Sequence, residues 1–148
     1  MSLKARIAED TKDAMRSRNR ERLGVLRLVS AAIKQKEVDE RIELDDTAVL
    51  AVLDKMAKQR RESLEQFTNA GRDDLAEKEQ FELEILSEFL PEPLGEDELN
   101  ALIDQVIADT GASGMQAMGQ VMGQLKAAVQ GRADMKAVSA AVRARLSA

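Results

Sequence analysis

The sequence predicts an all-α protein, and three observations support this fold class. Strong helix formers such as alanine, leucine, glutamate, lysine and arginine dominate the composition. Aromatic residues, which are enriched in β-strands, make up only 2% of the chain, with no tyrosine or tryptophan. Apolar residues recur at the spacing of a helix on both sides of a short stretch that contains the only two prolines.

The proline stretch, Leu90 to Gly95, is the strongest break in the chain. Proline lacks an amide hydrogen and moves the preceding residue out of the helical region, so a helix does not continue through it. We therefore expect an N-terminal helical domain over residues 1–90, a proline-containing linker over residues 91–95 and a small helical tail domain over residues 96–148. The linker is compatible with a stiff spacer and with a hinge.

About four helices are expected in the first domain and three in the second, because their apolar residues follow the helical period. Asp45 or Asp46 is expected to cap the third helix, and Asp73 the fourth. Ser113 and Asp134 are expected to cap the last two. Three methionines near the start of the sixth helix, Met115, Met118 and Met122, are interpreted as core residues rather than as an adaptable binding surface. The residues expected to face inward are Leu3, Ile7, Ala14, Met15, Leu23, Leu26, Val29, Ile33, Val49, Leu50, Leu53, Met56, Leu64, Phe67, Leu75, Leu83, Leu86 and Phe89 in the first domain, and Leu99, Leu102, Ile103, Val106, Ile107, Met115, Met118, Val121, Met122, Leu125, Val129, Met135, Val138, Val142 and Leu146 in the tail.

The chain contains no cysteine and no histidine, which excludes several kinds of site. Disulfides, zinc sites with Cys and His ligands, and catalytic pairs or triads that need Cys or His are impossible, and no cofactor is expected. The first ten residues carry charges throughout and do not resemble a secretory signal. The longest apolar run, Ala48 to Leu53, is too short to span a bilayer. The cytoplasm is therefore the expected location, with no membrane partner.

The net charge of −5 is distributed unevenly along the chain. Residues 1–36 carry ten lysines and arginines against four acids, residues 37–93 carry seven against seventeen, and residues 94–148 carry five against six. General nucleic-acid binders are usually basic overall, so any contact of this chain with a nucleic acid must be local. DNA is not expected as a partner.

Two charged clusters each have two interpretations. The acidic face of the fourth helix is interpreted as a solvated surface rather than as a Mg²⁺ or acid–base site, since helical metal sites usually include histidine. The basic run in the first two helices is interpreted as pairing with that acidic face rather than with phosphates. Arg60 and Arg61 are interpreted as solvated surface cations. The acids are Asp74, Glu77, Glu79, Glu82, Glu84 and Glu88, and the basic run is Lys12, Arg16, Arg18, Arg20, Arg22 and Arg27.

Gly119 and Gly123 lie four residues apart and therefore share one face of the sixth helix. Each costs about 1 kcal/mol of helix propensity relative to alanine, so a compensating contact is expected. They allow close approach of another backbone, either a helix, which the residues alone favour, or a nucleic-acid strand. Downstream, Lys126, Arg132 and Lys136 surround a turn and a helix start, which are compatible with a phosphate site or with ordinary turn chemistry.

Several short motifs, in a fixed order, make the chain similar to a known family. The motifs are Arg22-Leu23-Gly24-Val25-Leu26-Arg27, Lys58-Gln59-Arg60-Arg61-Glu62-Ser63, Phe67, Gly71-Arg72-Asp73-Asp74-Leu75, Leu90-Pro91-Glu92-Pro93-Leu94, Gly119-Gln120-Val121-Met122-Gly123-Gln124-Leu125-Lys126 and Gly131-Arg132-Ala133-Asp134. With these motifs the whole sequence resembles the GatB/YqeY family. Its tail resembles the C-terminal domain of the B subunit of the glutamine-dependent aspartyl/glutamyl-tRNA amidotransferase.

The resemblance implies an accessory tRNA-binding or adaptor protein related to that amidotransferase, a carbon–nitrogen ligase with glutamine as amido-nitrogen donor. It implies no intrinsic catalysis, because the catalytic cradle of the B subunit and the amidase of another subunit have no counterpart here. Aromatic side chains for base stacking are scarce, so recognition of RNA shape and backbone is expected. Transfer RNA and a protein of an amidotransferase or aminoacyl-tRNA complex are the expected partners, and the alternative is a helical protein–protein interaction module with no RNA contact. The residues that the resemblance places on a tRNA-facing surface are Gly119, Gly123, Lys126, Arg132 and Lys136.

Overall fold

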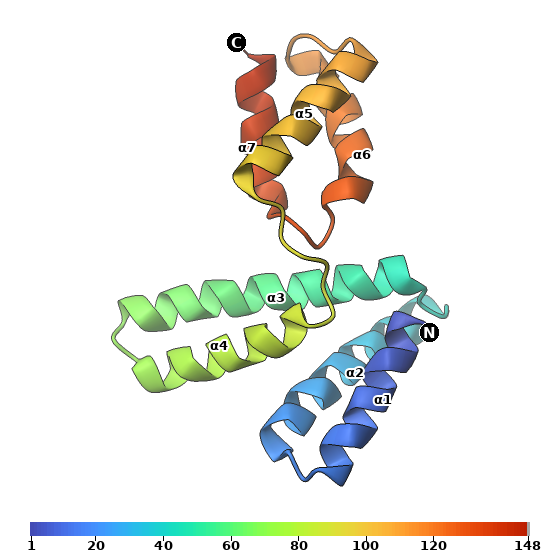
Figure 1. The fold of residues 1–148 in the computed structure, drawn as a ribbon, viewed down its shortest axis with the longest axis vertical. Coiled ribbons are helices and arrows are strands. Elements are labelled where there is room, and N and C mark those ends of the chain that lie inside the picture. Colours follow the sequence, from blue (N-terminus) through green and yellow to red (C-terminus); the bar gives the residue numbers. More distant parts are fainter. Residues whose placement is uncertain (148) are drawn as a thin grey trace. The chain divides into compact units, whose positions relative to one another are not determined.

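The computed structural model describes residues 1–147, which form seven α-helices, one short 3-10 helix and no strand (Figure 1). The predicted all-α class is confirmed over this part of the chain. The helices are α1 (Leu3–Arg16), α2 (Arg20–Glu40), α3 (Asp46–Asn69), α4 (Asp73–Ser87), α5 (Glu96–Thr110), α6 (Met118–Val129) and α7 (Met135–Leu146), and the 3-10 helix η1 is Met115–Ala117.

The chain divides into two compact units, the first from Met1 to Leu90 and the second from Pro91 onward. Helices α1 to α4 form the first unit, and α5 to α7 with η1 form the second. Independent folding of each unit, which a domain requires, stays a prediction. None of the helices within residues 1–147 combines the length and the apolar character needed to cross a membrane.

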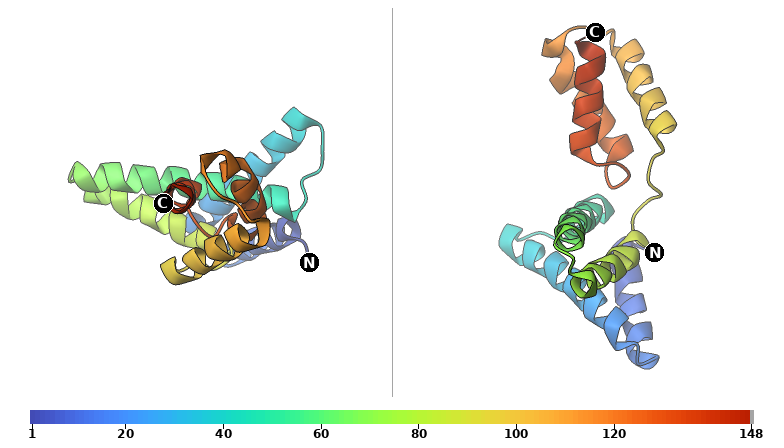
Figure 2. Two further views of the ribbon diagram at one scale, coloured as in Figure 1. Left: turned by 90° about the horizontal axis from the view of Figure 1, so that it is seen from above. Right: turned by 90° about the vertical axis from the view of Figure 1, so that its left-hand side faces the viewer.

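The first unit consists of two helical hairpins, α1 with α2 and α3 with α4 (Figure 1 and Figure 2). All four helices contribute to one core, and its side chains with at most 2% exposure are Ile7, Ala14, Leu26, Val29, Val49, Leu53, Ala57 and Leu86. Met15 was expected to face this core, but it is 53% exposed. It follows the buried Ala14 by one residue, and a step of about 100° around the helix takes its side chain away from the core stripe.

One carboxylate holds the connection between α2 and α3. Glu37 accepts hydrogen bonds from the ammonium group of Lys4 at 2.7 Å and from the backbone amide of Leu44 at 2.9 Å. These contacts, the lysine first, hold the pKa of Glu37 below its ordinary value. Leu44 is buried in the core although it lies outside any helix. Glu37, near the end of α2, therefore holds this loop residue in place and also binds Lys4 of α1.

Side-chain caps explain where several helices begin. Asp45 and Asp134 each accept a hydrogen bond from a backbone amide in the first turn of α3 and α7, as expected. The predicted cap at Asp73 is wrong, because this residue is the first of α4, where its charge favours the positive end of the helix dipole. The predicted cap at Ser113 is also wrong, since η1 intervenes and α6 begins without a side-chain cap.

The second unit packs α5, α6 and α7 around a separate core (Figure 2). Its fully buried side chains are Ile103, Val121, Leu125, Val129, Val138 and Val142. Met118 and Met122 are half-buried against this core, as expected, but Met115 is 44% exposed and its predicted core position is wrong. Met115 lies in η1, where roughly three residues per turn replace the α-helical winding and take the side chain out of the stripe of α6.

Candidate nucleic-acid interface

Both glycines of α6 are exposed on its outer side. A Cβ atom added to Gly119 or Gly123 would meet no described heavy atom within 4 Å outside the adjoining turns of the same helix. No other helix of the second unit approaches these glycines, so the packing against a neighbouring helix of this small unit, which the residues alone favour, is wrong. Lys126 continues the same line, because positions i, i+4 and i+7 share one side of a helix.

The exposed side of α6 contains two glycines and carries a single charge. We define the α6 outer face as six of the exposed residues of α6, which are Gly119, Gln120, Gly123, Gln124, Lys126 and Ala127. The fully buried Val121 and Leu125 lie on the other side, against the core. Lys126 carries the only charge of the α6 outer face, and its glycines leave the helix backbone accessible to a partner.

The turn between α6 and α7 has a lysine on each side. Lys126 lies in the last turn of α6 and Lys136 in the first turn of α7, and both are exposed. Gly131, between them, has a φ angle of +74°, a left-handed conformation that glycine adopts without strain. Neither ammonium group lies within 4 Å of a carboxylate among the described residues. Both charges are therefore available to an anionic partner.

Arg132 is engaged within the second unit. Its Nε donates to the carbonyl of Glu92 at 2.9 Å, and its own carbonyl accepts from the amide of Leu94 at 2.8 Å. Its guanidinium also lies 3.9 Å from a carboxylate oxygen of Glu98. Arg132 thus ties the proline-containing stretch to the α6–α7 turn, with one guanidinium N–H in a hydrogen bond and part of its charge directed at Glu98.

The start of α7 is less suited to a phosphate than expected. The carboxylate of Asp134 accepts from the backbone amide of Lys136 at 3.1 Å and places a negative charge at the helix N-terminus. A phosphate at this position would meet that carboxylate instead of free amides. Phosphate contacts at this turn are therefore expected from the side chains of Lys126 and Lys136.

The second unit has an acidic and a basic part, although its net charge is small. Residues 91–110, which include α5, carry six acids and no lysine or arginine. Residues 111–147 carry five lysines and arginines and a single acid. Arg145 pairs with Asp104 of α5 and Arg132 approaches Glu98, which leaves three of the five cations without an ion pair in the described structure. The α6–α7 part is therefore basic, which the summed charge of the tail conceals.

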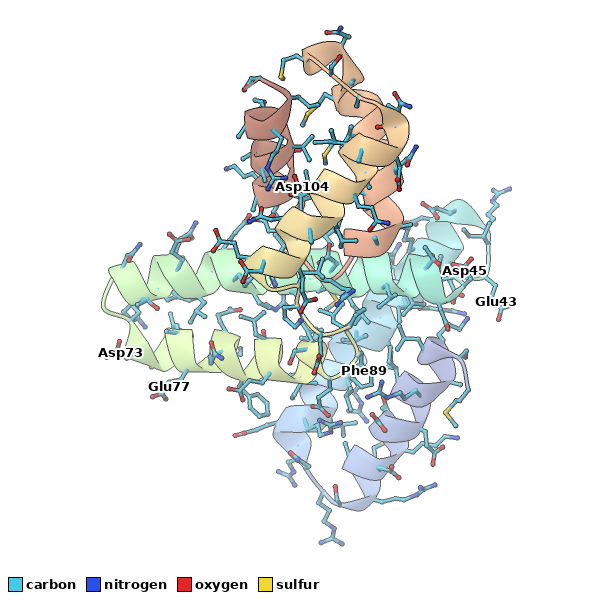
Figure 3. All side chains as sticks on the ribbon, turned by 45° about the horizontal axis from the view of Figure 1, so that its top comes forward. Glu43, Asp45, Asp73, Glu77, Phe89 and Asp104 are labelled. Atoms are coloured by element: carbon cyan, nitrogen blue, oxygen red, sulfur yellow. The ribbon has the colours of Figure 1, made fainter. Side chains whose placement is uncertain are left out.

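Two carboxylates of α4 face α3 instead of solvent. Glu82 is only 7% exposed and accepts from Nε of Arg60 at 2.8 Å. Oε2 of Glu79 lies 3.8 Å from the same nitrogen and has no hydrogen bond. The predicted solvated position is wrong for these three residues, whereas Glu77 is exposed and points away from α3 (Figure 3). Within residues 1–147, no three carboxylates converge as a metal site requires.

The basic run of the first two helices pairs with α4 at one residue. Arg22 lies 2.6 Å from a carboxylate oxygen of Glu88 and 3.6 Å from one of Asp10. Arg16 pairs only within its own helix. The predicted pairing with α4 is therefore wrong for most of the run. The residues of the run without an ion pair to any described residue are Lys12, Arg18, Arg20 and Arg27.

Comparison with known proteins gives one family. A family model described as "Yqey-like protein" matches residues 4–146. The protein of Pyrenophora tritici-repentis named "Altered inheritance of mitochondria protein 41, mitochondrial" is 33% identical over 130 residues, which are 86% of this chain and 71% of that protein. The protein of the same name from Eremothecium gossypii is 37% identical over 87 residues, 58% of this chain and 48% of that protein. An uncharacterized protein of Schizosaccharomyces pombe is 36% identical over 91 residues, 62% of this chain and 74% of that protein. The chain thus spans about half the length of one of these relatives and under three quarters of the other two.

The names of these relatives contradict the cytoplasmic location expected from the sequence. The first two are named as mitochondrial proteins. The expectation rested on a charged N-terminal stretch unlike a secretory signal and on the lack of a long apolar run. Neither observation distinguishes the cytoplasm from the interior of a mitochondrion, so the inference to the cytoplasm is wrong.

The family match runs through both compact units, from α1 to α7. It agrees with the resemblance in the short motifs, which include the proline-containing stretch and the glycine pair of α6. The chain belongs to the YqeY-like protein family.

Proposed function

We propose that this chain is an accessory protein that binds transfer RNA through the α6 outer face and the two lysines of the α6–α7 turn. The strongest support is the exposure of Gly119 and Gly123. Each glycine costs up to about 1 kcal/mol of helix propensity, and neither allows a close contact with another helix of the second unit. A partner that approaches the backbone of α6 closely compensates for this cost. The resemblance to the amidotransferase B subunit, whose tail domain helps to hold tRNA, favours tRNA as that partner.

The proposed surface combines close approach with charge. Gly119, Gly123 and Lys126 lie on one line along α6, and seven residues of helix rise about 10.5 Å. A sugar–phosphate backbone that lies over the two glycines therefore reaches the ammonium group of Lys126 at the end of the helix. Lys136 adds a second cation from the start of α7. Lysine is a compact point charge on a flexible stem, which suits phosphates without requiring one fixed geometry.

The second unit would recognise the shape and the phosphates of the RNA instead of its bases. All three phenylalanines lie in the first unit, and the chain has no tyrosine or tryptophan, so the second unit offers no aromatic platform for base stacking. Folded RNA presents phosphates and 2′-hydroxyl groups at regular positions. The acids of α5 repel the same phosphates, which orients the unit with α6 and α7 towards the RNA. An accessory or adaptor role in the amidotransferase system, without catalysis by this chain alone, agrees with this set of groups.

Binding of the purified chain to a mixed tRNA pool across a salt series tests the proposal. The wild type should bind and should weaken steeply as salt rises from about 50 to 200 mM, because bound phosphates release counterions. The variant Lys126→Ala/Lys136→Ala should lower the log–log slope by roughly 1.4 to 1.8, at about 0.7 to 0.9 for each lost contact. The matched control Lys55→Ala/Lys58→Ala removes two exposed cations of α3 and should leave the slope close to that of the wild type. Absence of tRNA binding at low salt refutes the proposal.

A protein partner is the second candidate for the α6 outer face. The observation that favours it is the single charge of this face, since charged residues are depleted at the centre of protein interfaces. Gly123→Leu and Lys126→Ala together distinguish the candidates. The bulk of Gly123→Leu blocks whichever partner lies on this face, whereas Lys126→Ala weakens only a phosphate contact. Loss of affinity for an isolated protein partner in Gly123→Leu, together with unchanged tRNA binding, would favour the protein partner.

A further inference from the structure

The outer side of α2 carries a line of cations and small residues. We define the α2 stripe as Arg20, Gly24, Arg27, Ala31 and Lys34, which follow one another at intervals of four and three residues and are all exposed. This spacing places the five residues on one side of the helix. The acidic residues of α2 lie outside the stripe, on its flanks and on other sides of the helix. One side of α2 is therefore basic along most of its length.

The cations of the stripe form no ion pair within the described residues, although Lys34 is close enough to Glu37 to help lower the pKa of that carboxyl. Among residues 1–147, no carboxylate lies within 4 Å of the charged groups of Arg20, Arg27 or Lys34. Arg22, which points to another side of α2, shows the contrast, since it pairs with both Asp10 and Glu88. The first unit places its intramolecular ion pairs on other sides of this helix and leaves the stripe charged.

Small residues separate the cations. A Cβ atom at Gly24 would meet nothing within 4 Å outside the neighbouring turns of α2, although glycine in a helix interior lowers helix propensity. Gly24 and Ala31 therefore leave no large side chain between the charges of the stripe. These charges recur about every 10.5 Å, the rise of seven helical residues. In α6, Gly123 likewise stands three residues before an exposed cation, Lys126, and its side is likewise open. The two units repeat one arrangement of glycine and cation.

We infer that the α2 stripe is a second surface for the sugar–phosphate backbone of a folded RNA. The inference rests on the proposed function for the class of ligand, and it adds a contact in the first unit. The three cations of the stripe lie in a line over about 21 Å, with only small side chains between them, and this arrangement suits a regular polyanion. Protein interfaces instead rely on large apolar or aromatic anchors near their centre. The α2 stripe contains no such anchor. Of the exposed large apolar residues of α2, Leu28 lies beside the stripe and Val38 lies beyond its end.

The test compares three variants of the full chain, in which the stripe variant and its control lose the same charge. The stripe variant is Arg20→Gln/Arg27→Gln/Lys34→Gln, and the tail variant is Lys126→Gln/Lys136→Gln. The matched control is Lys55→Gln/Lys58→Gln/Arg61→Gln, which removes three exposed cations from α3 of the same unit. All substituted side chains are exposed and without ion pairs in the described structure, so circular dichroism should show unchanged helicity.

Binding of a mixed tRNA pool across a salt series is the first measurement. We expect the stripe variant to lower the log–log slope by roughly 2.1 to 2.7, at about 0.7 to 0.9 per phosphate contact, and the control to change it little. Equal slopes for the stripe variant and the control would overturn the inference. A lower slope in the tail variant alone would support the proposed tRNA surface of the second unit and refute the α2 stripe. A lower slope in the stripe variant alone would support the α2 stripe and refute the surface of the second unit.

Two further measurements test how closely the RNA approaches α2 and whether an acidic protein binds there in its place. Gly24→Leu adds bulk without changing charge, and it should weaken tRNA binding while helicity is retained. Unchanged affinity in Gly24→Leu would contradict close approach of the RNA to α2. Polyglutamate serves as the probe for an acidic protein, and weaker polyglutamate binding by the stripe variant with unchanged tRNA binding would assign the stripe to an acidic protein partner instead.

Discussion

Replacing both glycines of α6 by alanine should stabilise the second unit and weaken tRNA binding at the same time. Gly123 lies in the interior of α6, so Gly123→Ala should gain about 1 kcal/mol of helix propensity. Gly119 lies in the first turn, where the gain is smaller. No described atom within 4 Å opposes either methyl group, so no steric cost offsets the gain. The sum is about 1 to 2 kcal/mol. In a unit of this size, each kcal/mol raises the melting temperature by roughly 4 to 8 °C.

Native-state hydrogen exchange of the amides in α6 and α7 measures this change in the second unit separately from the first. Gly24→Ala is the control, since it should raise protection in α2 and leave α6 unchanged. Slower exchange in α6 together with weaker tRNA binding is the expected result. Faster exchange would show that the glycines are required by the fold. Slower exchange with unchanged tRNA affinity would refute their role in close approach.

Three further substitutions test the contacts that the structure adds to the sequence. Arg60→Met leaves the buried carboxylate of Glu82 without its partner and should destabilise the first unit by about 1 to 3 kcal/mol in urea unfolding, less than for a fully buried pair because Arg60 is partly exposed. Asp134→Ala removes the cap of α7 and should cost about 1 kcal/mol, while tRNA binding becomes tighter because the only acid of residues 111–147 is lost. Glu37→Gln should remove a pH dependence. The pKa of Glu37 is lowered in the folded state from the ordinary value of 4.5, chiefly by the hydrogen bond from Lys4. Its contribution is therefore fully present above about pH 4.5 and is lost as the pH falls through the lower folded pKa.

Control variants accompany the first two of these tests. Arg60→Met/Glu82→Leu replaces the buried pair by apolar side chains and should recover much of the lost stability, because an apolar pair leaves no unpaired buried charge. Asp134→Asn keeps a good capping residue and removes the charge, so it should tighten tRNA binding without the loss of stability. For Glu37→Gln, the melting temperature is measured as the pH falls from about 6 through the lowered folded pKa of Glu37. A melting temperature that falls by the same amount in variant and wild type would contradict the assigned role, since only the wild type should lose the Glu37 contribution.

The sequence predicted most of the helices because their apolar residues repeat regularly. Val49, Leu53 and Met56 follow the helical period without interruption, and all three are buried in α3. Where the winding changes, prediction fails, as it does for Met115 in η1. A single sequence does not show that a 3-10 turn will precede an α-helix, so the side chain in that turn was assigned to the wrong side.

The burial of two α4 carboxylates was missed for a different reason. Acids are usually exposed, and the partner, Arg60, lies on another helix 22 residues away from Glu82. A signal was nevertheless present in the register. Glu79 and Glu82 follow Leu75 by four and seven residues, which are positions of the core stripe of α4. A charged residue in a core register predicts a partner on the facing helix, although it does not identify that partner.

The orientation of the α6 glycines also had a signal in the sequence. A glycine carries no hydrophobic side chain, so its own identity does not tell whether it faces inward or outward. Val121, Leu125 and Val129 repeat every four residues and fix the inner side of α6, which leaves Gly119 and Gly123 outside. The glycine spacing alone does not distinguish a neighbouring helix from an external partner, because only the packing of the second unit shows that no other helix of this unit approaches them.

Net charge is a poor guide to this protein because its charges are sorted by helix face. At physiological salt the Debye length is about 8 Å, and a helix with its side chains is about 10 to 12 Å across. A phosphate against the α2 stripe or the α6 outer face is therefore screened from acids on the far side of the same helix. The overall charge of −5 slows the approach of an RNA from a distance, mainly at low salt, whereas the contact itself depends on the cations within one Debye length. An acidic chain with basic helix faces is for this reason compatible with selective binding of a folded RNA. It is poorly suited to non-specific binding, since the net charge of −5 repels phosphates away from the α2 stripe and the lysines of the α6–α7 turn.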